Sequence, residues 1–302
     1  MAKLIFGCGY LGQRVAKLWS ERGDVLAVTR TVERGRELAH ANVLPIIGDV
    51  AARMQLPLPQ GIRTVLFAVG NDGNRGRSVH EVFVGGLSHA LDSLSPTVEK
   101  LIYISSTGVY GQVDGEMVDE ESPCRPLREG GRACLAAEEA LRRSSFAKKA
   151  IILRLAGIYG PGRIPRSRDL AQNKPIDAPA NGWLNLIHVD DAARIIVLAA
   201  RKLSPPRTFV VSDGRPVQRR EYYETLARLL KAPPPRFSEP AENSPAAARA
   251  ASDKRINPRR LMEELQPELL YPSYQEGLAA ILKVERADQT IISEEPEGPI
   301  AS

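Results

Sequence analysis

The chain has 302 residues, of which 43% are hydrophobic, 25% charged and 5% aromatic; this composition is typical of a globular protein and excludes fibrous and disordered classes. Its 3 cysteines show no Cys-x-x-Cys spacing and its 4 histidines form no His-x-x-x-His pair, so neither a disulfide framework nor a metal site is indicated. The net charge of +5 conceals a more basic body, because the stretch 285–302 holds five acids and one base and leaves residues 1–284 at +9.

The amino-terminal half alternates short apolar runs with longer amphipathic stretches. The runs are almost continuously apolar, as in strands that are buried on both faces of a parallel sheet. Six strands are predicted, at residues 4–6, 25–28, 43–47, 65–69, 101–104 and 151–153. Helices are predicted between them, at residues 11–22, 31–39, 78–94 and 130–145. This alternation predicts an α/β fold with a doubly wound parallel sheet and right-handed crossovers.

After residue 155 the pattern is less regular. Residues 157–181 are rich in glycine, proline and arginine, as in a loop that lines a site. A strand is predicted at 184–189, a helix capped by Asp190 and Asp191 up to about residue 202, a strand at 208–211 and a helix at 219–231. Residues 232–245 read as a proline-rich connection and residues 258–284 as two short helices.

No membrane span or signal peptide is predicted. No stretch approaches the ~20 consecutive apolar residues that cross a bilayer. The amino terminus becomes glycine-rich at Gly7, before the apolar core of a signal peptide could form. We therefore expect a cytoplasmic protein with no membrane partner.

A glycine-rich motif lies between the first predicted strand and the first predicted helix. Residues 7–12, GCGYLG, fit Gly-x-Gly-x-x-Gly, in which the first glycine permits a tight turn, the second admits a pyrophosphate and the third packs closely on the strand. The helix N-terminus would provide N–H groups for the phosphates. The alternative is a glycine-rich turn that binds nothing. We predict a Rossmann-like dinucleotide site with these contacts: Gly7, Gly9, Tyr10, Leu11 and Gly12.

The residues after the second and third strands indicate which dinucleotide binds. An NAD site usually has an Asp or Glu at the end of the second strand, whereas this chain has Arg30. A guanidinium can bind a 2′-phosphate, so NADP(H) is favoured over NAD(H), although Arg30 could instead be an exposed residue of the next helix. Asp49 is expected either to accept a hydrogen bond from adenine or to cap a helix. The other predicted cofactor contacts are Val50, Ala68, Val69, Gly70 and Ser105.

These predictions divide the chain into regions. Residues 1–160 form the dinucleotide-binding domain, to which residues 184–203 return. Residues 161–183 and 204–284 form a smaller carboxyl-terminal substrate-binding cap. Residues 285–302 are predicted to be a disordered acidic tail.

Four segments, in this order, resemble the extended short-chain dehydrogenase/reductases, the group of sugar-nucleotide epimerases and dehydratases. They are GCGYLG at 7–12, YISSTGVYG at 103–111, LRLAGIYGPG at 153–162 and NLIHVDD at 185–191. The segments KRIN at 254–257 and LYPSY at 270–274 resemble the end of an atypical bacterial subgroup that is described as NAD(P)-dependent epimerase/dehydratase-like. The resemblance covers most of residues 1–284.

The resemblance implies a Ser or Thr after the fifth strand that works with a Tyr-x-x-x-Lys pair on the next helix. Ser106 matches the serine position. One alignment places Gly131 and Leu135 where the tyrosine and lysine belong, and a shift by one residue gives Gly130 and Cys134. None of the 8 tyrosines has a lysine four residues later. The usual acid/base pair is therefore missing.

Hydride transfer needs a proton donor, so another group must replace the pair, or the protein performs no redox chemistry. The predicted catalytic residues are Ser106, Thr107 and Tyr110; Tyr159 and Cys134 are further candidates. Tyr110, Tyr159 and Cys134 could each be packing residues instead. Arg163 and His188 are predicted to contact substrate; the alternatives are a solvated basic loop that also holds Arg166 and Arg168, and a histidine buried at a strand end.

We expect an NADP(H)-dependent oxidoreductase or epimerase that acts on a nucleotide-sugar or a related carbonyl compound. The alternative is a non-catalytic NADP(H)-binding redox sensor. A nucleic-acid partner is not expected despite the basic body, because the sequence shows no helix-turn-helix pattern and no aromatic residues interleaved with bases. The predicted helices at 78–94 and 130–145 resemble those of a four-helix dimer interface, so we expect a homodimer.

Overall fold

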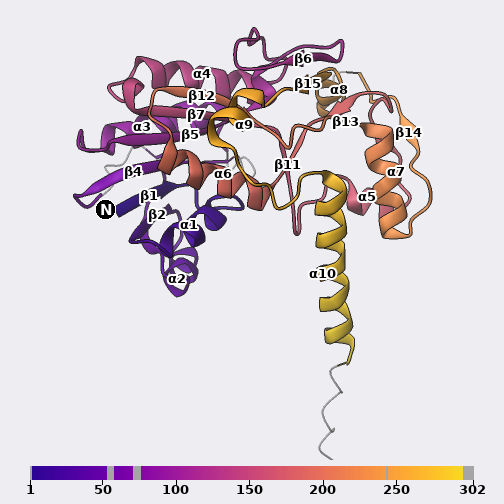
Figure 1. The fold of residues 1–302 in the computed structure, drawn as a ribbon, viewed down its shortest axis with the longest axis horizontal. Coiled ribbons are helices and arrows are strands. Elements are labelled where there is room, and N and C mark those ends of the chain that lie inside the picture. The colour runs from indigo at the N-terminus through magenta and orange to yellow at the C-terminus, as the bar shows by residue number, and fades with distance from the viewer. Residues whose placement is uncertain (1, 53–57, 71–75, 243, 295–302) are drawn as a thin grey trace, which may run out of the picture.

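Seven parallel strands form the central sheet of the computed structural model, which describes residues 2–52, 58–70, 76–242 and 244–294 (Figure 1). Their order is β3-β2-β1-β4-β5-β7-β12, and every neighbouring pair is parallel. The bounds are β1 (Ala2–Phe6), β2 (Val25–Thr29), β3 (Leu44–Ile47), β4 (Ile62–Phe67), β5 (Lys100–Ser106), β7 (Ala150–Leu155) and β12 (Arg207–Val211). The doubly wound Rossmann-like α/β fold is therefore confirmed.

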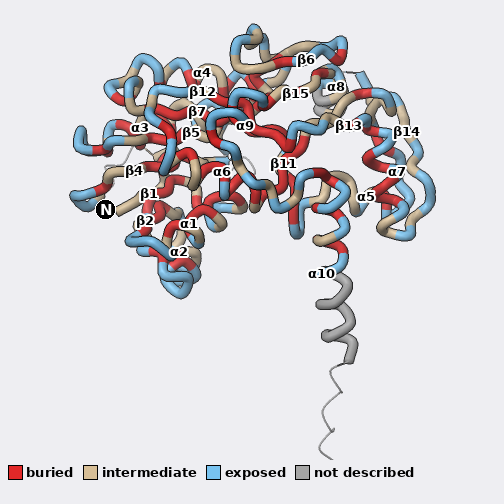
Figure 2. Tube along the Cα trace, viewed as in Figure 1, coloured by how far each residue is buried: buried red, intermediate tan, exposed pale blue. Residues whose placement is uncertain are grey.

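Helices cover both faces of the sheet. One layer contains α1 (Gly12–Ser20), α2 (Val32–His40), α6 (Val189–Lys202) and α9 (Arg259–Leu265), and the other contains α3 (Gly86–Ser93) and α4 (Glu129–Arg143). Along β1, Ile5 packs into the first layer, and Leu4 and Phe6 pack into the second. This burial on both faces, visible in Figure 2, explains why the strands read as continuous apolar runs.

The smaller region lies at one end of the sheet and has its own apolar core (Figure 1). That core joins α7 (Arg219–Leu230) to α10 (Tyr274–Glu294), through contacts such as those of Tyr222 and Leu278. Two short helices, α5 (Ser167–Ala171) and α8 (Pro245–Ala250), belong to the same region.

Short strand pairs connect the segments around this region. Strand β6 (Glu116–Val118) pairs with β15 (Lys254–Ile256), and β8 (Gly157–Tyr159) pairs with β11 (Leu186–His188). Strand β9 (Ile176–Asp177) pairs with β14 (Phe237–Ser238), and β10 (Trp183–Leu184) pairs with β13 (Val217–Gln218). Each pair brings together segments that are far apart in the sequence.

Four details differ from the sequence analysis. Strand β12 pairs with β7, so residues 207–211 extend the main sheet instead of belonging to the cap. The stretch 78–94 contains a π-helical turn, Glu81–Gly85, before α3. The cap of α6 is His188, whose Nδ1 accepts a hydrogen bond from the N–H of Asp190 at 3.2 Å, because the two predicted caps already lie in the first helical turn.

The fourth difference concerns the predicted acidic tail. Helix α10 continues to Glu294, so residues 285–294 are helical and the prediction of disorder is wrong for them. Alanine, glutamate, glutamine and arginine in this stretch favour a helix once packing of the preceding turns has nucleated it. Residues 295–302 lie outside the described part of the chain.

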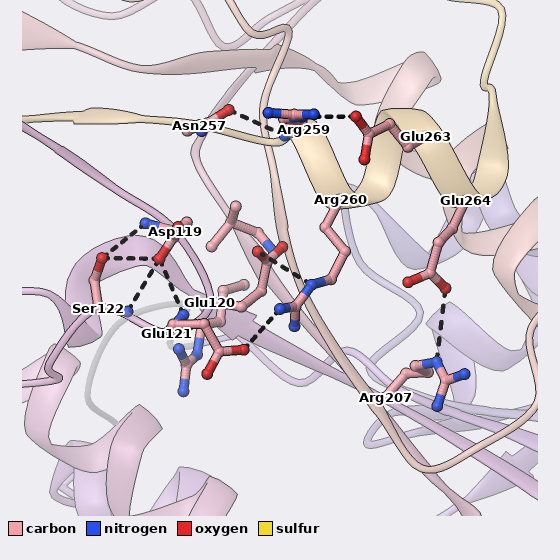
Figure 3. Close-up of polar contacts among 12 residues, drawn as sticks. Asp119, Glu120, Glu121, Ser122, Arg207, Asn257, Arg259, Arg260, Glu263 and Glu264 are labelled. Carbon is pink, nitrogen blue, oxygen red and sulfur yellow. Dashed lines mark hydrogen bonds and ion pairs between the residues drawn. The ribbon is translucent and has the colours of Figure 1, made fainter.

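The edge of the sheet at β12 is covered by charged side chains (Figure 3). Glu120 accepts a hydrogen bond from the N–H of Val210 at 2.8 Å, although burial raises the pKa of this carboxyl. Arg260 of α9 pairs with Glu121 at 2.7 Å, and Arg207 lies 3.6 Å from Glu264. These contacts protect an edge that could otherwise pair with another strand.

Candidate functional site

The glycine-rich loop follows β1, at the point where the strand order of the sheet reverses. From β1 the sheet continues through β2 to β3 on one side and through β4 to β12 on the other. Ligands of doubly wound sheets bind in the crevice at this point, outside the carboxyl ends of the strands. The segments that follow β1, β2, β3, β4, β5 and β7 therefore meet at the candidate site.

The three glycines of the loop have different surroundings. Gly7 has a φ of 87°, and a Cβ there would lie 2.5 Å from the carbonyl oxygen of Ala68. A Cβ on Gly12 would overlap the carbonyl oxygen of Gly7. A Cβ on Gly9, in contrast, would meet nothing within 4 Å. These are the surroundings that a tight turn, a close helix contact and an open phosphate position require, so the loop fits a dinucleotide.

The two residues between the second and third glycines hold the loop in place. Leu11 is buried at the N-cap of α1, and its carbonyl accepts hydrogen bonds from the N–H groups of Arg14 and Val15. The hydroxyl of Tyr10 donates to the carbonyl of Pro161 at 3.1 Å. The loop is thereby connected to the segment that follows β7 and β8.

Two arginines lie beyond the end of β2. Arg30 follows the strand directly and is exposed. Arg34 lies in the first turn of α2, and its Nη2 donates to the carbonyl of Cys8 in the glycine-rich loop at 3.2 Å. Sequence reasoning missed Arg34, although a second base four residues after Arg30 was a usable signal. Arg34 therefore lies beside the loop, and Arg30 is four residues earlier in the chain.

Asp49 lies after β3 and has partners for both carboxyl oxygens. Oδ1 accepts a hydrogen bond from the N–H of Ala51 at 2.9 Å, and Oδ2 pairs with Arg77 at 3.0 Å. This is an Asx turn and not the alternative helix cap, because residues 50–52 form a turn. The next residue, Val50, is buried, and its carbonyl accepts a hydrogen bond from Nδ1 of His89 at 3.0 Å.

The three residues after β4 line the next part of the edge. Ala68 donates its N–H to the carbonyl of Phe6 at 2.8 Å, which continues the pairing of β4 with β1. Val69 is half-buried and Gly70 is exposed. A Cβ on Gly70 would meet no atom of the described residues within 4 Å. The chain therefore leaves the sheet directly beside the glycine-rich loop.

The residues at the end of β5 and just after it differ in how far they are buried. Ser106 is half-buried, and its Oγ accepts a hydrogen bond from the N–H of Gly108 at 3.0 Å. Thr107 is buried, and its carbonyl accepts from the N–H of Tyr110 at 3.2 Å. Of the three predicted catalytic residues, Ser106 has the most exposed hydroxyl-bearing side chain.

Ser105 and Tyr110 belong to a buried polar network below the site. Ser105 donates to Glu138 at 2.6 Å, and Arg154 donates to both oxygens of that carboxylate at 2.9 and 2.7 Å. Arg154 also donates to the hydroxyl of Tyr110 at 2.7 Å, and burial raises the pKa of that phenol. Tyr110 is 1% exposed, which favours the packing alternative over a catalytic role.

Helix α4 has no acid/base pair at either alignment. A Cβ on Gly131 would overlap the carbonyl oxygen of Gly108, so a tyrosine could not fit there. A Cβ on Gly130 would meet nothing within 4 Å, so that position faces open space. Cys134 is buried, and burial raises the pKa of its thiol to about 12. Gly130 therefore leaves room for a side chain where Gly131 does not, and α4 carries neither a tyrosine nor a lysine at the positions of either alignment.

The two predicted substrate residues lie in different environments. Arg163 is exposed, and its guanidinium lies 5.4 Å from the ring centroid of Tyr10. His188 is 1% exposed and its ring lies 3.9 Å from that of Tyr271. Burial lowers the pKa of His188 to about 4, so the ring is neutral, and its Nε2 has no hydrogen-bond partner among the described residues. Arg163 is thus at the loop surface and His188 is beneath it.

The described ranges hold neither a cluster of metal-binding side chains nor a helix suited to a membrane. Nowhere in residues 2–52, 58–70, 76–242 and 244–294 do three His, Cys, Asp or Glu side chains gather as a metal ion would require. Within the same ranges, none of the helices combines the length and apolar character needed to span a bilayer.

Comparisons with known proteins agree with this geometry. A model of the NAD dependent epimerase/dehydratase family matches residues 4–212. Protein YeeZ from Escherichia coli strain K12 is 27% identical over 276 residues, which are 89% of this chain and 95% of that protein. A functionally unknown conserved protein from Silicibacter pomeroyi DSS has a TM-score of 0.79 at 25% identity, over 94% of this chain and 99% of that one. MoeE5 in complex with UDP-glucose and NAD has a TM-score of 0.74 at 22% identity, over 96% of this chain and 100% of that one.

Proposed function

Because the chain belongs to the NAD dependent epimerase/dehydratase family, we propose that it is an NADP(H)-dependent oxidoreductase or epimerase that acts on a carbonyl compound or a nucleotide-sugar. The resemblance found in the sequence is thereby confirmed, and the family makes the chain an NAD(P)-dependent oxidoreductase or epimerase by class. When bound, the dinucleotide would accept or supply a hydride. The chain's own residues would bind the dinucleotide, orient it and transfer the proton to or from the substrate.

The observation that carries the proposal is the open position at Gly9. Gly7 and Gly12 are held against backbone atoms, and Gly9 alone of the three has open space on the side where a side chain would project. In this motif the middle glycine is the position at which the backbone must be free of a side chain for a pyrophosphate to approach. Helix α1 begins three residues later, at Gly12, and the N–H groups and dipole of a helix N-terminus favour a pyrophosphate.

NADP(H) is preferred in this proposal because two arginines occupy the region after β2. Arg34 reaches the carbonyl of Cys8, which brings its charge to the glycine-rich loop, and Arg30 precedes it by four residues. A guanidinium can bind a 2′-phosphate through charge-assisted hydrogen bonds. A carboxylate at the end of β2, which would favour NAD(H), is replaced here by Arg30.

Replacing Arg34 by alanine is expected to raise the dissociation constant for NADPH by about 10-fold or more, because a hydrogen bond to a charged group contributes ~1.5–3 kcal/mol. The dissociation constant for NADH should rise far less, since NADH has no 2′-phosphate and loses only the effect of the Arg34 bond to the Cys8 carbonyl. Fluorescence titration with both dinucleotides measures this difference. Arg36→Ala, an exposed arginine on the same helix, is the control and should affect neither dinucleotide. Equal weakening of NADPH and NADH by Arg34→Ala would refute the assignment.

The substrate class is tested by absorbance at 340 nm. The protein is saturated with NADPH and mixed with a panel of nucleotide-sugars, including UDP-glucose, which MoeE5 binds, and simple aldehydes and ketones. Oxidation of NADPH by a member of the panel supports the proposal. Tight binding of NADPH with neither oxidation of NADPH nor epimerisation of any nucleotide-sugar in the panel favours a redox sensor, and binding of neither dinucleotide contradicts the proposal.

We also propose that the protein is a homodimer through the layer that contains α3 and α4. These helices pack side by side on one face of the sheet, as a four-helix interface between two copies requires. Light scattering coupled to size-exclusion chromatography would measure the mass of the particle in solution. A mass twice the 33.0 kDa of the chain is expected, and a mass equal to that of one chain would contradict this part.

A further inference from the structure

Lys254 is a buried lysine that contacts the loop after β5, although the two are far apart in the sequence. Lys254 is 8% exposed. Its Nζ donates to the carbonyl of Tyr110 at 3.0 Å and to the hydroxyl of Ser252 at 2.5 Å. Tyr110 is four residues after Ser106, so the amine is attached to the segment that supplies the half-buried serine of the candidate site.

Strand pairing fixes this position. β15 pairs with β6 in parallel, with Lys254 opposite Glu116, and the N–H of Asp253 donates to the carbonyl of Gln112 at 2.9 Å. Ile256, two residues further along β15 and on the same face, packs in a cluster with Tyr110 and Cys134. The side chain of Lys254 therefore projects toward the face of α4 on which Cys134 lies.

Arg128 is a cationic residue near Gly130 in the chain, and its charge affects Lys254. It is the N-cap residue of α4, two residues before Gly130. Its Nη2 lies 3.5 Å from the position that a Cβ on Gly108 would take, and Ser106 bonds to the N–H of that glycine. The guanidinium is close enough to lower the pKa of both Cys134 and Lys254. Arg128 thus lies beside the serine loop at the start of α4, and its positive charge acts on the lysine.

The surroundings of Lys254 favour release of a proton. Burial and the charge of Arg128 lower the pKa of the amine to about 8, and Asp253 opposes them in part. The uncharged phenol of Tyr110 and thiol of Cys134 belong to the cluster beneath it. Over the described residues, no carboxylate lies within 4.0 Å of Nζ to hold the proton in an ion pair. Among the described residues Nζ is bonded to two neutral oxygens, and an amine held in this way can give up its proton and regain it.

We propose that Lys254 donates the proton that a carbonyl substrate needs, in place of the missing tyrosine and lysine on α4. This inference rests on the proposed function. The carbonyl carbon accepts a hydride from NADPH, the C=O π bond breaks toward oxygen, and that oxygen takes a proton from Nζ. The carbonyl is reduced to an alcohol, NADPH is oxidised to NADP⁺, and the neutral amine regains a proton from water. Ser106, on the same loop, donates a second hydrogen bond to that oxygen.

Two substitutions separate proton donation from a structural role. Lys254→Met removes the proton, whereas Lys254→Arg keeps the positive charge and the donors to the Tyr110 carbonyl but cannot release a proton in this pH range. Both are expected to lower kcat for NADPH oxidation by about 10²-fold or more, the usual size of general acid catalysis, with the NADPH dissociation constant unchanged. The substrate used is whichever panel carbonyl the wild type reduces.

Lys100→Met is the matched control. Lys100 is half-buried, and its Nζ donates to the carbonyls of Ala200 and Leu203 at 2.6 Å each. It begins β5, at the opposite end of that strand from Ser106, so its loss should leave kcat unchanged. This control removes a lysine that is also bonded to two neutral oxygens, without touching the site.

The protonation state gives a readout that needs no turnover. In protein labelled with ¹³C at the lysine ε-carbons, the resonance absent from Lys254→Arg is expected to titrate with a midpoint of about 8, against ~10.4 for an ordinary lysine. Because the donor must be protonated for reduction, kcat of the wild type should fall as pH rises through this midpoint. Lys254→Met should lose that fall.

The outcomes distinguish this inference from the proposed function. Wild-type kcat in Lys254→Arg, or a titration midpoint at the ordinary lysine value, would overturn the role of Lys254 and leave the proposed function standing. A wild type that neither oxidises NADPH with any member of the panel nor epimerises any nucleotide-sugar in it would overturn both. Loss of kcat in both Lys254 variants with intact NADPH binding supports both.

Discussion

Replacing Gly9 by valine is expected to raise the dissociation constant for NADPH by about 100-fold. The branched side chain would occupy the space in which the pyrophosphate approaches the backbone, and loss of two charge-assisted hydrogen bonds at ~1.5 kcal/mol each gives this factor. Stability should not change, because a Cβ at Gly9 meets nothing within 4 Å and Gly9 is not among the described glycines with positive φ. Fluorescence titration and thermal unfolding measure the two effects.

Gly85→Val is the control for this prediction. Gly85 lies in the π-helical turn before α3, and a Cβ there also meets nothing within 4 Å. The same side chain is therefore added in equally open space away from the glycine-rich loop, and NADPH binding should be unaffected. If Gly9→Val bound NADPH like the wild type, the loop would not be the phosphate site.

Arg154→Met is expected to lower the free energy of unfolding by about 3–5 kcal/mol, since it leaves a buried charge without its partner. The carboxylate of Glu138 is 0% exposed and receives two hydrogen bonds from Arg154. Burial alone would raise the pKa of Glu138, yet the bonds from Arg154 and Ser105 and the charge of Arg142 keep it lowered and the group ionised. Urea denaturation followed by circular dichroism measures the loss.

Arg142→Met provides the comparison at the same carboxylate. Arg142 donates to Glu138 at 2.9 Å, but its side chain is 44% exposed, so its removal should cost only ~0–1 kcal/mol. The double variant Glu138→Leu/Arg154→Met, which removes both charges, should be more stable than Arg154→Met alone. Equal losses for Arg154→Met and Arg142→Met would show that the network does not support the site as described.

The sheet was predictable because its determinants are local. Strands such as β1 and β4 are buried on both faces, and strands of this kind have continuous apolar runs in their sequence. The place of β12 was not predictable, because its pairing with β7 sets Arg207 opposite the distant Ile151 and depends on packing of the whole sheet. Local patterns predict that a strand exists but do not determine which strands it pairs with.

The candidate site also has features that depend on local sequence and features that depend on long-range contacts. The glycine-rich loop was visible because turn, phosphate approach and helix packing all act within residues 7–12. Packing was the alternative given for Tyr110, but its partner was not visible, since Arg154 lies 44 residues away. Lys254 was passed over because its position depends on the pairing of β15 with β6, which sets it opposite the distant Glu116. Residues brought in by long-range pairing carry no local signal.

The central claim is that the glycine-rich loop and its arginines bind NADP(H), and calorimetric titration of the wild-type protein with NADPH and with NADH tests it most directly. The structure predicts that both dinucleotides bind, because Gly9 is open to a pyrophosphate in either case. It also predicts that NADPH binds more tightly, because Arg34 lies against the loop close to Arg30. Binding of neither dinucleotide, or tighter binding of NADH, would contradict the claim.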